Sequence, residues 1–470
     1  MSKQMSSPIE ELDGAEKSSL SIESSPSVEN KKLLRKVDLR VLPMLFIVYF
    51  AAFLDRVNIS NALTLGLPKD LGLVGYQSNI ALTIFFVPYV LFEIPSNILM
   101  KRFKPHKWQW IVSGCILAFG VIMLAQGFVQ SYGGLLATRF CLGLAEAGIF
   151  PGSLYLISFW YKREEAQRRF SVFWCSVLTA NMSGSLLASA IANINGVRGY
   201  SSWRWIFILE GIFTILVGIV AYFLLADFPE DVKWLTEEER NWVIVRTGRE
   251  KDFVQHIEMG DILHFFAQPK NILGGLMYFA IIVPTYGFAY FGPTIVKTLG
   301  YSTVQTQLHT VPPFAAALAL ALILAFLSDR TRVRIPYIIF CSALTIAGLI
   351  TLINVHHSFP VQYAAIHLVA LGSFSAGPIV ICWFVMNLHG HAERSIGTAW
   401  MISFGNTGGF ISTFAFLASD APRYIKGYTI CLTLAVVGFL ASCLYGLLIW
   451  RGNKKLRSTS EQGKAVYYSL

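Results

Sequence analysis

Two adjacent charged residues, Asp55 and Arg56, lie in the middle of an apolar run that extends from residue 41 to residue 65. The run is long enough to cross a lipid bilayer as one helix. A charge at the centre of such a helix costs about 2.5 to 3.5 kcal/mol on insertion scales, so charges that are kept there commonly serve an ion or a charged ligand. The alternative is that they belong to a neutral ion pair that only holds helices together.

A second pair of opposite charges, Arg139 and Glu146, lies in another apolar run. The spacing of seven residues is two helical turns, which places both side chains on one face of a helix. An arginine matches a carboxylate with two parallel hydrogen bonds, which makes Arg56 the best candidate to bind an anion. A buried carboxylate takes up or releases a proton when its surroundings change. The open alternative for Arg139 and Glu146 is a static ion pair.

The composition identifies the kind of chain that carries these charges. It has 470 residues, of which 54% are hydrophobic and 14% charged, with a mean hydropathy of +0.54. This is far too apolar for an average soluble protein and indicates a polytopic membrane protein. The net charge of +10 comes from Lys and Arg clusters between the apolar runs. Such clusters set orientation in a membrane, so we expect no nucleic-acid partner.

Twelve apolar runs of spanning length predict an all-α polytopic membrane protein with two six-helix halves. The runs lie at about 41–65, 78–100, 109–128, 133–160, 170–192, 204–226, 271–292, 309–327, 335–354, 361–388, 398–418 and 428–450. The basic residues concentrate before the first run, after the even-numbered runs and after the last. Both termini are therefore expected in the cytoplasm.

These boundaries predict the following organisation: a disordered cytoplasmic tail at 1–38, a six-helix bundle at 39–226, a central cytoplasmic loop at 227–270, a second bundle at 271–450 and a cytoplasmic tail at 451–470. The central loop contains a capping-box pattern, Thr236 followed by Glu239, which predicts a short helix. Two similar halves are typical of secondary transporters.

Cofactor sites are not expected. The seven cysteines lack metal-ligand spacing, and the His389 and His391 pair is expected to be solvated. No nucleotide-binding loop pattern occurs, so transport would have to be secondary.

Several segments resemble the major facilitator superfamily and, within it, the anion:cation symporter family. Residues 53–62 read Phe-Leu-Asp-Arg-Val-Asn-Ile-Ser-Asn-Ala, which is similar to the first-span signature of that family. Residues 89–97 resemble its second span, 139–152 its fourth, and 227–240 the central loop of fungal members. The loop after the second span departs from the superfamily pattern, because Asn97 and Lys101 replace a Gly and an Asp. The second half keeps Asp329 and Arg330, which the resemblance implies are gating residues.

The resemblance also implies roles for single residues. Arg56 would bind the substrate, Asp55 and Glu146 would carry the proton, and Arg139 would support the two acids. Tyr89, Asn181 and Asn406 match substrate-contacting positions, although either amide could instead join two helices. Glu93, four residues after Tyr89, is either a titratable cavity residue in proton coupling or a satisfied packing residue.

Two further features leave alternatives open. Adjacent helical residues point about 100 degrees apart, so Asp55 and Arg56 need not pair with each other. If Asp55 faces the fourth span and Arg56 the cavity, a static pair is less favoured. Tyr286 and Trp383 either line the cavity or belong with the other aromatic residues at the lipid boundary.

The leading hypothesis is a proton-coupled symporter that imports a small organic monocarboxylate, such as nicotinate or a related vitamin-like acid, by alternating access. It would be a monomer in the plasma membrane, with the organic anion and the lipid bilayer as its partners, and it would not be an enzyme. The alternative is a nutrient sensor that binds a similar ligand without transporting it.

Overall fold

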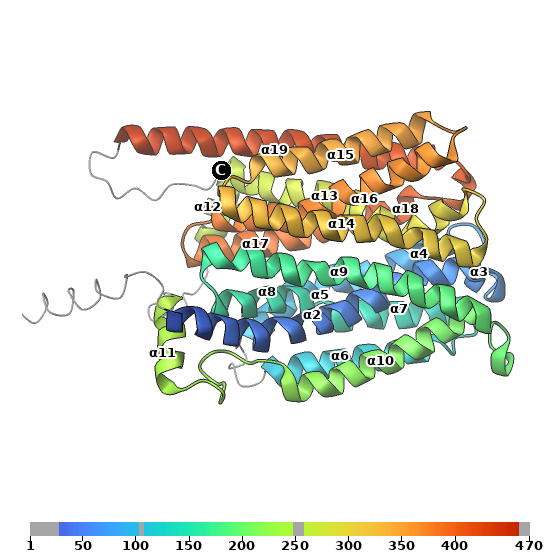
Figure 1. The fold of residues 1–470 in the computed structure, drawn as a ribbon, viewed down its shortest axis with the longest axis horizontal. Coiled ribbons are helices and arrows are strands. Elements are labelled where there is room, and N and C mark those ends of the chain that lie inside the picture. The colour runs from blue at the N-terminus through green and yellow to red at the C-terminus, as the bar shows by residue number, and fades with distance from the viewer. Residues whose placement is uncertain (1–27, 103–107, 248–257, 460–470) are drawn as a thin grey trace, which may run out of the picture.

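The structure is a computed structural model that describes residues 28–102, 108–247 and 258–459. Most of the expected N-terminal tail, the loop at 103–107, the middle of the central loop and the end of the C-terminal tail lie outside these ranges. Within the described ranges the regular secondary structure is entirely helical, and the long helices run roughly parallel to one another (Figure 1).

Ten helical stretches are long and apolar enough to cross a membrane. They are α2 (Val28–Thr64), α6 (Trp108–Gln126), α7 with α8 (Tyr132–Glu146 and Ile149–Trp160), α9 (Arg163–Ile191), α10 (Ser202–Leu224), α13 (Pro269–Lys297), α14 (Thr303–Thr331), α15 (Ile335–Asn354), α16 (Phe359–Met386) and α19 (Ile425–Thr459). They account for ten of the twelve predicted spans.

The second and eleventh predicted spans are each built from two shorter helices. The second consists of α4 (Gln77–Thr83) and α5 (Phe86–Arg102), and the eleventh of α17 (His391–Asn406) and α18 (Gly408–Ala415). Each of these helices is by itself shorter than 18 residues, since α5 has 17 residues and α17 has 16. Helix α2 begins at Val28, so residues 28–38 are helical although we expected them to be part of a disordered tail.

The two halves of the chain form two groups of helices that lie side by side (Figure 1). The first half contains α2 to α10, and the second half contains α13 to α19. The halves are in contact where α14 packs against α9 and where α13 packs against α2. We call the side with the start of α2, α11 (Glu237–Arg246) and the end of α19 the terminal side. The opposite side, with α3 (Leu67–Asp70) and the turns η3 (Ala192–Ile194), η4 (Val197–Gly199) and η6 (Ala418–Asp420), is the distal side. The short helix α12 (Met259–Ala267) precedes α13.

Helix α11 confirms the helix predicted from the capping box in the central loop. The Thr236 side chain accepts from the Glu239 backbone N–H, and the Glu239 carboxylate accepts from that of Thr236. Glu239 also forms an ion pair with Lys36 at 2.7 Å, and the Lys36 ammonium group lowers the pKa of the Glu239 carboxyl. A second ion pair joins Arg246 to Glu165. These contacts attach α11 to the first half of the chain.

A break between two helices positions Glu146. Helix α7 ends at Glu146, and α8 begins at Ile149 with Pro151 in its first turn, where a missing N–H leaves no helical bond unmade. One turn before the break, a side chain at Gly143 would lie 2.1 Å from the Phe85 carbonyl oxygen. The glycine therefore allows α7 to approach the junction between α4 and α5, as close packing through small residues permits.

Candidate functional site

Arg56 and Glu146 form an ion pair where the two halves meet. Both side chains are fully buried. The Arg56 Nε donates to Glu146 Oε2 at 3.3 Å, and Nη2 donates to Oε1, so the guanidinium holds the carboxylate with two bonds. The static pair considered from the sequence, Arg139 with Glu146, is therefore not the ion pair of the structure: Glu146 pairs with Arg56 of α2 instead.

A chain of hydrogen bonds continues from this pair into the second half. Arg56 Nη1 donates to the Tyr286 hydroxyl at 2.7 Å, and that hydroxyl donates to Asn406 Oδ1 at 3.2 Å. The Asn406 amide nitrogen donates to the Glu93 carboxylate at 3.2 and 3.4 Å. The structure thus brings together Arg56, Glu146, Asn406 and Glu93 from four helices, with Tyr286 of α13 as the link between them.

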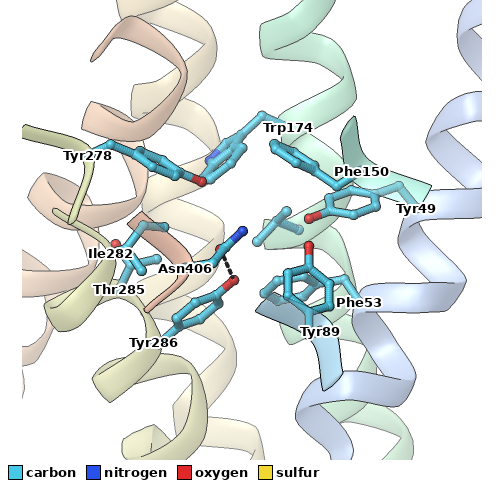
Figure 2. A pocket seen from close by; sticks show the side chains of 11 residues that line it. Tyr49, Phe53, Tyr89, Phe150, Trp174, Tyr278, Ile282, Thr285, Tyr286 and Asn406 are labelled. Atoms are coloured by element: carbon cyan, nitrogen blue, oxygen red, sulfur yellow. Dashed lines mark hydrogen bonds between the residues drawn. The ribbon is translucent and has the colours of Figure 1, made fainter. Parts of the chain in front are cut away.

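A narrow space lies beside this chain, between the halves (Figure 2). Mainly aromatic side chains line it: Tyr49, Phe53, Tyr89, Phe150, Trp174, Val177, Tyr278, Ile282, Thr285, Tyr286 and Asn406. They leave room for little more than a water molecule. Tyr89 stands in the wall, with its ring centre 4.7 Å from the Arg56 guanidinium carbon. The site is nearly closed in this conformation, so an organic ligand needs these walls to separate.

The distal side of the site is closed by hydrogen bonds between the two halves. The Gln307 amide donates to the Thr64 hydroxyl at 2.8 Å, and the Ser60 hydroxyl donates to the Tyr290 carbonyl oxygen. The second closure joins α4 to α18, where the hydroxyls of Thr83 and Thr413 lie 2.7 Å apart. The pocket lies on the terminal side of Arg56, since Tyr49 precedes Arg56 by seven residues, or about 10 Å along α2. Access from the distal side is therefore blocked in this structure.

Asp55 and Arg139 occupy a separate part of the first half. Asp55 Oδ2 accepts from the Thr214 hydroxyl of α10 at 2.7 Å, so Asp55 is held by the sixth span. Arg56, not Asp55, is bonded to the fourth span, which reverses the arrangement considered from the sequence. Arg139 Nη1 donates to the Arg56 carbonyl oxygen at 3.3 Å, and its other two nitrogens have no hydrogen-bond partner among the described residues.

Three further predicted site residues, Asn181, Asp329 and Arg330, also lie outside the hydrogen-bond chain. The Asn181 amide donates to the Val177 carbonyl oxygen of its own helix at 2.8 Å. Asp329 is half-buried and Arg330 exposed at the terminal end of α14, where gating would take place. Of the two aromatic candidates, Tyr286 lines the pocket, whereas Trp383 packs against Tyr445.

Sequence reasoning missed Glu210 and Thr214. Glu210 is 2% exposed within α10, and neither of its carboxylate oxygens has a hydrogen-bond partner in the described part of the chain. The signal was present in the sequence, because Glu210 is a lone acid inside the apolar run at 204–226 and meets the same criterion as Asp55. No comparable signal separated Thr214 from other threonines in apolar runs.

Two helical halves that meet at a buried, charged site are typical of transporters. A family model described as Major Facilitator Superfamily matches residues 45–413. The chain therefore belongs to the Major Facilitator Superfamily. It is a membrane transporter and not an enzyme.

The chain resembles named transporters along most of its length. It is 34% identical over 448 residues to the MFS-type transporter cnsO of Penicillium expansum, covering 90% of this chain and 84% of that protein. It is 32% identical over 380 residues to a putative tartrate transporter of Agrobacterium vitis, covering 81% and 86%. The solved structure of the proton:xylose symporter XylE shares the fold with a TM-score of 0.69 at 15% identity, covering 90% of this chain and 96% of that one.

Proposed function

We propose that the protein is a proton-coupled symporter of small organic anions in the anion:cation symporter family. The observation that carries the proposal is the buried, two-bonded ion pair of Arg56 and Glu146. A guanidinium in a water-poor site between two helical halves is suited to hold a carboxylate. An acid that competes for the same guanidinium provides the link to the proton.

The coupling follows from competition for Arg56. While Glu146 is ionised, it occupies the edge of the guanidinium formed by Nε and Nη2. A proton on Glu146 removes the negative charge that holds Arg56, so the substrate carboxylate can take its place. The reverse also holds: a bound anion favours the protonated form of Glu146, because two carboxylates on one buried guanidinium would leave a net negative charge away from water. Proton and anion therefore bind together and leave together.

The pocket supports a small carboxylate with an apolar body. Tyr89, Phe53 and Tyr286 surround the Arg56 guanidinium, and Phe150 and Trp174 extend the aromatic wall. Flat aromatic side chains favour a ring acid such as nicotinate or a related vitamin-like monocarboxylate. The similarity to a putative tartrate transporter supports carboxylates as the substrate class.

Alternating access would take place by rocking of the two halves about this site. The basic loops on the terminal side place both termini in the cytoplasm in our proposal. The closed distal side then corresponds to a conformation sealed toward the outside. We propose the plasma membrane as the location and a monomer as the working unit.

Purified protein in liposomes tests this function. A panel of radiolabelled acids, including nicotinate, pantothenate and tartrate, is offered with and without an inward proton gradient. We expect one class of carboxylate to accumulate above its external concentration only with the gradient. Binding of an acid without accumulation would contradict transport and favour a nutrient sensor. Accumulation that is independent of the gradient would contradict proton coupling.

A further inference from the structure

Four carboxylates and two guanidiniums are buried inside the described membrane spans. The acids are Asp55, Glu93, Glu146 and Glu210, and the cations are Arg56 and Arg139, all at most 2% exposed. If all six were ionised, two negative charges would remain without a cation. Isolated buried charges are strongly unfavourable, so a core of this composition retains protons on some of its acids. The Glu146 and Arg56 pair is balanced, which leaves the other acids as the ones to examine.

Glu210 faces Asp55 across the contact between α10 and α2. Thr214, one helical turn after Glu210, donates to Asp55 Oδ2 at 2.7 Å, so this face of α10 points at Asp55. Glu210 lies within electrostatic range of Asp55. Both Glu210 oxygens and Asp55 Oδ1 are buried and have no hydrogen-bond partner within the ranges that the structure describes. A proton carried by one acid and donated to the other would give two of these three oxygens a partner.

The charged groups around this pair are few. Helix α2 contributes Asp55 itself. Arg139 and Glu146 of α7 interact electrostatically with Asp55. Two other helices, α6 and α9, also pack against α10. Apart from cysteines, the described part of α6 and the part of α9 from residue 170 onward contain no titratable side chain. Arg56 is assigned to Glu146, and Glu93 is bonded to Asn406 of the second half. Arg139 is therefore the one described buried cation that remains for Asp55 and Glu210. One cation between two carboxylates leaves one proton to be shared.

We propose that Asp55 and Glu210 form a second proton-binding site, which holds one shared proton separately from the Arg56 and Glu146 pair. The inference deepens the proposed function and rests on it for the step in which this proton is carried with the anion. The proton comes from water on one side, resides on a carboxylate oxygen, and returns to water on the other side, so no further reactant is needed. Glu210 lies eight residues, or about 12 Å, from the distal end of α10. Gln126 at the distal end of α6, whose buried amide also has no described partner, adds a polar group near that end.

Infrared spectroscopy of the purified protein in lipid tests the site without requiring transport. At neutral pH the wild type should show the carbonyl band of a protonated, buried carboxylic acid that shifts in heavy water. Glu210→Gln and Asp55→Asn should each reduce this band by the contribution of one acid, because the acid that remains beside Arg139 is then balanced. Glu93, which carries the other excess charge of the core, keeps its contribution in both variants. The double variant should remove no more than either single variant. The exposed Glu237→Gln is the control and should leave the band unchanged.

Three outcomes would overturn the shared site. They are an unchanged band in Glu210→Gln, an unchanged band in Asp55→Asn, and additive losses in the double variant. If Glu210→Gln does not fold, Thr214→Val keeps both acids and should shift the band, and an unshifted band would count against the site.

A transport experiment in liposomes tests whether this proton is carried with the anion. The membrane potential at which net anion flux stops gives the ratio of protons to anions. We expect Glu210→Gln to lower this ratio by one proton, and an unchanged ratio would contradict a role in the cycle. Failure of the wild type to accumulate any anion would instead contradict the proposed function and leave the infrared result intact.

Discussion

The Arg56 guanidinium donates a hydrogen bond of 2.7 Å to the hydroxyl of Tyr286, which lies 230 residues later in the chain. The bond joins the two halves at the point where Glu146 also holds Arg56. A substrate that draws Arg56 away from Glu146 therefore also changes a contact between the halves. This is the physical link by which binding at the site would bias the position of one half against the other.

Replacing Tyr286 by Phe removes the hydroxyl and leaves a buried guanidinium N–H without its partner. A hydrogen bond to a charged group is worth about 1.5 to 3 kcal/mol, so the unfolding temperature of the ligand-free protein should fall measurably. A saturating carboxylate substrate should restore part of the loss, because it gives Arg56 a new acceptor. Thermal unfolding with and without substrate measures both effects. Tyr76→Phe, on the exposed distal side, is the control. Equal effects of the two variants would contradict a role for the Tyr286 hydroxyl.

Replacing Arg56 by Lys keeps the charge but loses the two-bond geometry. Losing one charged hydrogen bond corresponds to roughly a tenfold or larger decrease in uptake efficiency. Initial uptake rates over a range of anion concentrations give the change in kcat/KM. The exposed Arg423→Lys should leave it unchanged. Wild-type efficiency in Arg56→Lys would mean that the carboxylate binds elsewhere.

A disulfide across the distal closure should stop the cycle. The hydroxyls of Thr83 and Thr413 lie 2.7 Å apart, which is close enough for cysteines at both positions to meet the geometry of a disulfide. Oxidation of the Thr83→Cys/Thr413→Cys variant should block uptake, and a reductant should restore it. The two single variants control for native cysteines. Continued uptake in the cross-linked protein would contradict alternating access through the distal side.

Asp70 provides a test of pH dependence outside the membrane spans. Its carboxylate accepts from the Ser201 hydroxyl and from Trp203 Nε1, at 2.8 Å for the indole, and the Ser201 hydroxyl contributes most to lowering the pKa of Asp70. A lowered pKa in the folded state stabilises the fold above the unfolded value of about 4, and this stabilisation disappears as the pH falls through the folded value. Asp70→Asn should therefore unfold at a lower temperature than the wild type at neutral pH. The difference should close in strong acid, and a gap that is constant from pH 7 to the acid range would contradict the contribution of the charge.

Much of the fold could be predicted from the sequence because each apolar run must satisfy its backbone internally as a helix. Ten runs became spanning stretches, and the two exceptions are each divided between two shorter helices. The start of α2 was misjudged because its first turns are polar and carry no spanning signal.

The candidate site could be predicted only in part. Charges inside apolar runs identified Arg56, Glu93 and Glu146, since burial of a charge is rare without a role. Their partners were not predictable, because pairing depends on which helices meet and not on spacing within one helix. Tyr286, one of 19 tyrosines, was a possible cavity residue, but nothing in the sequence predicted its bond to Arg56.

Glu146→Gln tests the central claim most directly, because the amide keeps the size of the side chain and removes its charge and its proton. Two uptake measurements in liposomes compare it with wild type: accumulation driven by a proton gradient, and exchange of labelled for unlabelled anion at equal concentrations. The account predicts that Glu146→Gln loses accumulation against a gradient and retains exchange. Undiminished gradient-driven accumulation in Glu146→Gln would contradict it.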